Sequence, residues 1–233
     1  MGIEMLNTTK LTAAVLALAL AGPLAAQDGE PKSGGTLNVV IQPEPPSLMI
    51  GLVQNGPTQM VGGDIYESLL RYDFDLKPEG QLAESWEISE DGKTYTFKLR
   101  EGVTFHDGTT MDAEDVKFTL DRINAEDSAN AQKALYAAIS EVNVIDPQTV
   151  EVKLSEPNGN MLFNLAWGDA VIVAPETVET IKQTPIGTGA FKFENWNQGD
   201  KITLTRNDDY WGEAPALASA TFKFISDPTA AFA

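Results

Sequence analysis

The 233-residue chain has no cysteine and only one histidine, His106. Without cysteine, we expect neither a disulfide framework nor a lipid anchor. Basic residues are also scarce, because 16 Lys and Arg stand against 34 Asp and Glu, which gives a formal net charge of −18. Nucleic acid and anionic membrane surfaces would repel so acidic a chain, and the same charge favours a soluble monomer.

The apolar run near the start, Leu11–Gly22, is too short to span a bilayer, which needs about 20 apolar residues. It follows Lys10 and precedes a Pro-Leu-Ala-Ala-Gln stretch. This order of charge, apolar run and small residues is typical of a secretory signal peptide. We therefore expect residues 1–26 to be a cleaved signal peptide, residues 27–33 a polar linker, and the mature protein to be periplasmic.

The remaining chain mixes strand and helix patterns without a regular βαβ rhythm, which predicts an α+β fold or a mixed sheet with helices. Strands are expected at 36–41, in a hairpin around Asp91-Gly92, in a pair flanking Pro147-Gln148, and at 187–196, 201–207 and 220–225. Helices are expected at 60–70, after Asp112, and at 131–139 and 160–167.

His106 stands in an acidic stretch, so a metal site or an acid–base pair is one interpretation. The neighbouring acids are Asp107, Asp112, Glu114 and Asp115. Asp112 is also a good N-cap for a helix whose apolar stripe follows, and acidic residues are favoured in a first helical turn. Zinc needs three or four ligands in defined geometry, and the chain has no G-x-S-x-G nucleophile motif. We therefore expect a helix start here, with no metal site, no cofactor and no enzyme activity.

Five segments carry a resemblance to a known family. They are GGTLNVVIQPEPPSL (34–48), IYESLLRYD (65–73), the long stretch from Leu82 to Ile123, IGTGAFKF (186–193) and RNDDYWGEAP (206–215). In order and spacing they resemble the family 5 extracellular solute-binding proteins, the peptide/nickel type that serves ABC importers. Two departures are small: Ala190 stands where proline is usual, and Asp112 where threonine is usual.

The resemblance implies a two-lobed periplasmic binding protein (type II, cluster C-like), of which this chain is an N-terminal fragment with the second lobe missing. Residues 34–233 would form part of the first lobe. Within it, 34–60 and 183–233 are expected to form the core sheet region, and 61–182 an inserted α+β subdomain.

The function that the resemblance implies is capture of di- or oligopeptides and their delivery to a membrane permease. We expect this truncated form to be impaired in binding. A nickel chelate, an opine or a sugar stays open as the solute. The alternatives are a secreted single-lobe adaptor and, less favoured because no nucleophile and base set is visible, a secreted hydrolase.

Five residues are candidate ligand contacts. Glu44 matches the place where the family's first loop approaches the ligand, or else it only caps that loop. Trp167 and Asp169 could receive an amine-bearing ligand, or else they are a core tryptophan and a surface aspartate. Gln54 and Asn55 are weaker candidates in the same region of the sequence.

Overall fold

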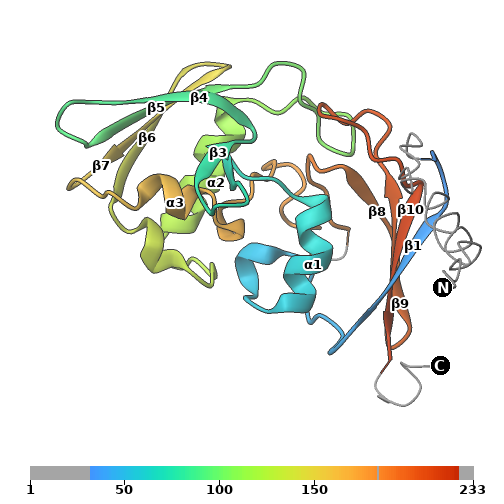
Figure 1. Ribbon diagram of the computed structural model, residues 1–233. Coiled ribbons are helices and arrows are strands. Elements are labelled where there is room, and N and C mark those ends of the chain that lie inside the picture. The colour runs from blue at the N-terminus through green and yellow to red at the C-terminus, as the bar shows by residue number, and fades with distance from the viewer. Residues whose placement is uncertain (1–31, 183, 226–233) are drawn as a thin grey trace, which may run out of the picture. The chain divides into compact units, whose positions relative to one another are not determined.

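The computed structural model describes residues 32–182 and 184–225 (Figure 1). The predicted signal peptide and most of the predicted linker lie outside the described residues. The chain divides into two units, Met1–Lys32 and Ser33–Ala233. All elements below belong to the second unit.

The first sheet joins the start of this unit to its end. Its strands are β1 (Thr36–Ile41), β10 (Ser219–Phe224), β9 (Lys201–Arg206) and β8 (Phe191–Asn197), in that spatial order. β1 runs parallel to β10, and the other pairs are antiparallel. Helix α1 (Gly56–Ile65) contributes Val61 and Ile65 to the apolar cluster of this sheet. The predicted strand at 36–41 is confirmed, as are the three later strands, with β8 beginning four residues after its predicted start.

The second sheet is antiparallel throughout, and its strands lie in the order β4 (Ala83–Ile88), β5 (Thr94–Leu99), β7 (Thr149–Leu154) and β6 (Ile139–Asp146). In β5, Tyr95, Phe97 and Leu99 are buried and alternate with more exposed residues, which is the pattern of a strand with one face on a core. Helix α2 (Ala113–Asn124) packs on β6 and β7. Both predicted strand pairs and the Gly92 turn, with φ of 69°, are confirmed.

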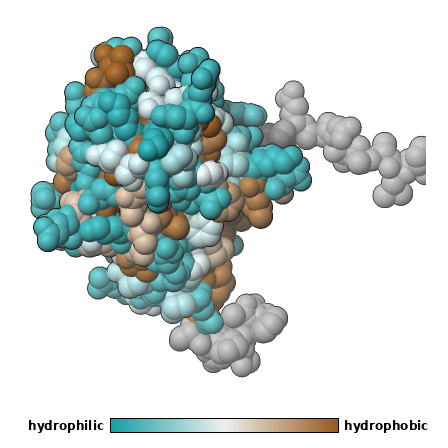
Figure 2. All heavy atoms as spheres, turned by 90° about the vertical axis from the view of Figure 1, so that its left-hand side faces the viewer, coloured by the Kyte–Doolittle hydropathy of each residue, from teal (hydrophilic) through white to brown (hydrophobic). Residues whose placement is uncertain are grey.

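Smaller elements lie between these strands and helices along the chain. They are the hairpin β2 (Leu70–Tyr72) and β3 (Pro78–Gly80), helix α3 (Met161–Leu165), and 3-10 turns at Ile50–Leu52, Lys133–Tyr136 and Gly168–Ala170. The two sheets have separate apolar clusters, whereas the predicted subdomain bounds at 61 and 182 stay a prediction. From the side at the left of Figure 1, hydrophilic residues cover most of the surface (Figure 2). None of the described helices has the length and apolar character needed to cross a bilayer.

Two predicted helices are wrong in extent. The helix expected at 60–70 begins at Gly56, because Asn55 caps it, and ends at Ile65, whose carbonyl accepts a hydrogen bond from Gly189 N at 2.9 Å. The helix expected at 131–139 is only the short 3-10 turn, since strand β6 already begins at Ile139. In both places a contact with a distant segment replaces the helical hydrogen bond that local spacing favours.

Candidate functional site

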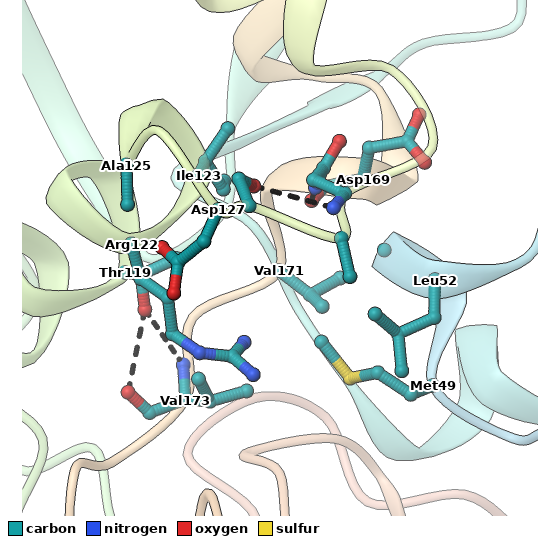
Figure 3. Close-up of a pocket in the computed structure, with 14 residues that line it drawn as sticks. Met49, Leu52, Thr119, Arg122, Ile123, Ala125, Asp127, Asp169, Val171 and Val173 are labelled. Carbon is teal, nitrogen blue, oxygen red and sulfur yellow. Dashed lines mark hydrogen bonds between the residues drawn. The ribbon is translucent and has the colours of Figure 1, made fainter.

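A cavity of about 220 Å³ opens where three segments meet: the 3-10 turn after Met49, the end of α2 with the loop that follows it, and residues 169–173 (Figure 3). Its apolar wall consists of Met49, Leu52, Ile123, Ala125, Ala129, Val171 and Val173. Ile123, Val171 and Val173 are also buried members of the two apolar clusters. One side of the cavity is therefore formed by the buried core.

Hydrogen bonds from two consecutive residues, Asn130 and Ala131, hold the three walls together. Asn130 Nδ2 donates to the carbonyl oxygen of Asp169 at 2.9 Å, and the next residue, Ala131, donates its N–H to Gly51 O at 2.9 Å. A Cβ on Gly51 would lie 3.1 Å from that same Asp169 oxygen and 3.2 Å from Asn130 Nδ2. Because these distances are tighter than ordinary contacts, glycine at position 51 permits the close approach.

The α2 side of the cavity is fixed in the same way. Thr119 Oγ1 accepts a hydrogen bond from Val173 N at 3.1 Å and lies 3.3 Å from Val173 O (Figure 3). Lys133 Nζ donates to the carbonyl oxygens of Ala125 and Glu126, at 2.5 and 3.0 Å, just beyond the end of α2. This lysine therefore holds the C-cap residue Ala125 and the residue after it in place.

Three of the five predicted contact residues come together beside this cavity. Gln54 Nε2 donates a hydrogen bond to Asp169 Oδ1, and Trp167 Nε1 donates to Gln54 Oε1 at 3.3 Å. Gln59 adds a second donor to Gln54 Oε1, at 2.9 Å. Gln54 therefore orients both the indole and the carboxylate.

Trp167 is more exposed and Asp169 more buried than one interpretation of the sequence predicts. Asp169 is 1 % exposed, whereas Trp167 is half-buried, so a core tryptophan beside a surface aspartate is wrong. Burial raises the pKa of Asp169 to about 6, against a lowering effect of the Gln54 hydrogen bond. Its Oδ2 has no hydrogen-bond partner among the described residues, and its carboxylate points away from Arg122 and Val173 (Figure 3).

Two aromatic residues that sequence reasoning missed surround Trp167. The rings of Tyr72 and Phe163 are tilted by 42° to each other with centroids 4.7 Å apart, and they lie 6.2 and 6.4 Å from the indole. Tyr72 OH donates to Phe163 O at 2.7 Å. Phe163 stays 40 % exposed. The two residues are 91 positions apart, so no local pattern could have paired them.

The other two candidates make contacts within the fold and do not line the cavity. Glu44 Oε1 accepts hydrogen bonds from Trp196 Nε1 at 2.7 Å and from Gly199 N at 3.1 Å, which ties the first loop to the β8–β9 turn. Asn55 Oδ1 accepts from Thr58 N at 2.8 Å and caps α1. A ligand contact by either residue stays a prediction.

His106 binds the backbone of the 187–189 loop. Its Nε2 donates to Gly189 O at 2.9 Å, and its Nδ1 accepts from Gly187 N at 3.4 Å. Burial lowers its pKa, so the ring is neutral near pH 7. Asp112 and Asp115 form a capping box at the start of α2, which confirms the predicted helix start. Within the described ranges no three acidic or histidine side chains group as metal ligands.

Comparisons with known proteins agree with this architecture. The family described as bacterial extracellular solute-binding proteins, family 5 (middle), matches residues 77–233. The glutathione-binding protein GsiB of Salmonella paratyphi A is 35 % identical over 175 residues, which cover 73 % of this chain and 34 % of GsiB. The chain thus spans about a third of the length of the curated relatives it matches.

Two solved structures extend the likeness to three dimensions. AgaA from A. tumefaciens R10, in complex with agropinic acid, has a TM-score of 0.79 and 35 % identity, covering 85 % of this chain and 41 % of AgaA. The oligopeptide-binding protein AppA from Bacillus subtilis, in complex with a nonapeptide, has a TM-score of 0.80 and 31 % identity, covering 86 % and 42 %. These likenesses confirm the predicted fold class.

Proposed function

The chain belongs to the bacterial extracellular solute-binding proteins of family 5, and from this we propose that it captures solutes for an ABC importer, with di- and oligopeptides as the solute class. Peptide-type ligands are named for three of its relatives: glutathione for GsiB, a nonapeptide for AppA and the peptide STSA for DppA of Helicobacter pylori. Because the family is one of binding proteins, the proposal is capture without turnover.

The observation that carries this proposal is the cavity between the 3-10 turn after Met49, the end of α2 and residues 169–173. It combines an apolar wall with a few charged and polar groups, which is the usual make-up of a small-molecule site. Its volume of about 220 Å³ lies below the roughly 300–1,000 Å³ of complete pockets. We infer that it holds one residue or one end of a longer solute.

The remaining parts of the proposal follow from the family. A second lobe would close over the rest of the solute by a hinge motion, and the closed form would dock on a membrane permease. Export by the signal peptide at residues 1–26 would place a monomer in the periplasm without a lipid anchor. Trp167, with Tyr72 and Phe163 around it, would contact apolar parts of the solute that extend beyond the cavity.

A titration of the 15N-labelled chain with tri-alanine, followed by NMR, tests the proposal. We expect saturable shifts of the Gly51, Asn130 and Val171 amides, with a Kd near 1 mM, since a cavity that covers only one end of a peptide contributes only about −4 kcal/mol. The peptide should remain intact throughout. Absence of saturation up to about 10 mM would contradict peptide capture by this chain.

A matched pair of variants locates the binding. Leu52→Trp adds bulk at the cavity wall and should abolish the amide shifts. Leu76→Trp makes the same change in the β2–β3 turn, where Leu76 is 67 % exposed, and should leave the amide shifts as in the wild type. Equal binding by both variants would place the peptide elsewhere on the molecule.

A further inference from the structure

Most polar groups that line the cavity already have partners inside the protein. Thr119 is hydrogen-bonded to the backbone of Val173, Asn130 to Asp169 O, and Ser128 Oγ accepts from Asn130 N at 3.2 Å. These groups shape the cavity, but their hydrogen-bonding capacity is largely used. A solute that enters must therefore meet the charged residues at the rim.

Besides the buried Asp169, two charged side chains line the cavity, Arg122 from the last turn of α2 and Asp127 from the loop that follows (Figure 3). Both are exposed. In the part of the chain that the structure describes, neither forms an ion pair, whereas the exposed Arg71 and the half-buried Arg206 each hold a carboxylate at 2.7 Å. The guanidinium of Arg122 is thus free to meet a solute.

A purely structural role does not account for Arg122. A cation in the last turn of a helix stabilises the carbonyl end, but Lys133 already donates hydrogen bonds to the carbonyls of Ala125 and Glu126 there. The chain carries a formal net charge of −18, so an anionic solute is repelled by the protein as a whole. A free cation at the cavity rim offsets that repulsion at one point.

We propose that Arg122 recognises a carboxylate of the solute, so that the cavity selects the acid-bearing end of a peptide; this rests on the proposed function. The planar guanidinium can donate two parallel N–H···O bonds to a carboxylate, a geometry that lysine lacks. Asp127 on the same rim repels a doubly charged phosphate more strongly than a singly charged carboxylate. The apolar wall then accepts the side chain next to that carboxylate.

Calorimetric titration with tri-alanine and with its C-terminal amide tests this assignment. The wild type should bind the free acid roughly tenfold more tightly than the amide, as expected for a partly exposed charged hydrogen bond. Arg122→Gln should remove this preference, and Arg122→Lys should keep part of it. Asp127→Asn removes a repelling charge from the same rim and should therefore keep the preference or increase it. Preference retained in R122Q, or lost in D127N, overturns the inference.

A second measurement separates this inference from the proposed function. If neither peptide binds, peptide capture has failed, and sodium acetate then tests Arg122 alone by NMR. At constant ionic strength, acetate in place of chloride should shift the Arg122 Nε–H signal, identified by its absence in R122Q, more than the signals of the ion-paired Arg71 and Arg206. Equal shifts of all three arginines would show that Arg122 is no carboxylate site. Unchanged thermal unfolding of R122Q excludes a structural cause, because Arg122 is exposed.

Discussion

Two buried carboxylates, Glu67 and Asp169, have opposite surroundings. Glu67 is 4 % exposed and accepts four hydrogen bonds, from Thr188 Oγ1, Tyr210 OH and Trp211 Nε1 at 2.8 Å each and from Gln81 Nε2 at 3.2 Å. Asp169 is 1 % exposed and accepts one side-chain hydrogen bond, from Gln54, while its second oxygen has no partner among the described residues.

This difference in hydrogen bonding indicates that Glu67 joins parts of the fold, whereas Asp169 forms part of the wall of a site. A buried charge is tolerated when its hydrogen-bonding positions are filled, and then it holds its partners in place. Glu67 joins the chain after α1 to the 187–189 loop and to Tyr210 and Trp211, segments that are far apart in sequence. Asp169 lies beside the cavity with one oxygen unsatisfied, a defect more typical of functional positions than of a core.

The largest loss of stability is expected when Glu67, which joins distant segments, is replaced. Glu67→Ala leaves three buried or half-buried donors of Thr188, Tyr210 and Trp211 without their acceptor, and should lower the free energy of unfolding by about 3–5 kcal/mol. Glu79→Ala, which removes an exposed carboxylate paired with Arg71, is the control and should cost less than about 1 kcal/mol. Urea denaturation of both variants measures the difference, and similar losses would show that Glu67 holds nothing together.

The next largest loss of stability is expected at Gly187, in the loop that Glu67 contacts through Thr188. A Cβ at Gly187 would overlap the Ile65 carbonyl oxygen and lie 2.8 Å from Tyr66 Cδ1, so Gly187→Ala should destabilise the fold by about 2–4 kcal/mol. Gly63, inside α1, has no atom within 4 Å of its added Cβ. Gly63→Ala should therefore stabilise by about 0.5–1 kcal/mol, since alanine favours a helix over glycine. A melting temperature of Gly187→Ala equal to or above that of the wild type would contradict the close approach at Gly187.

The fold could be predicted from the sequence wherever local patterns decide it. The alternation of Tyr95, Phe97 and Leu99 marked β5, and Asp112 with the stripe behind it marked α2. Prediction failed at Ile65, where the 187–189 loop ends α1 earlier than helical spacing indicates. A contact across more than a hundred residues leaves no trace in a short window.

The candidate site was predictable only in part for the same reason. Trp167 and Asp169 are close in sequence, and Gln54 was a weak candidate, but their hydrogen bonds join positions 113 and 115 residues apart. Arg122 and Asp127 were overlooked because charged residues near a helix end are common on any surface. Their significance comes from the cavity that they line, which only the folded chain forms.

The smallest of these effects is a dependence of the folding stability on pH, which the buried Asp169 should cause. Burial raises the pKa of Asp169 from 3.8 to about 6, so between about pH 4 and pH 6 the folded protein retains a proton that the unfolded chain releases. The free energy of unfolding therefore falls as pH rises through this window, and Asp169 ionisation removes about 2 kcal/mol by pH 7.

Asp64 and Asp115 also have pKa values raised to about 6 by burial, so the wild type alone cannot isolate Asp169. The measurement is the difference between Asp169→Asn and wild type in urea denaturation at pH 4 and pH 7. Because the amide stays neutral, that difference should shift by about 2 kcal/mol in favour of the variant at pH 7. A difference between Asp169→Asn and wild type that is the same at pH 4 and pH 7 would show that burial does not raise the pKa of Asp169.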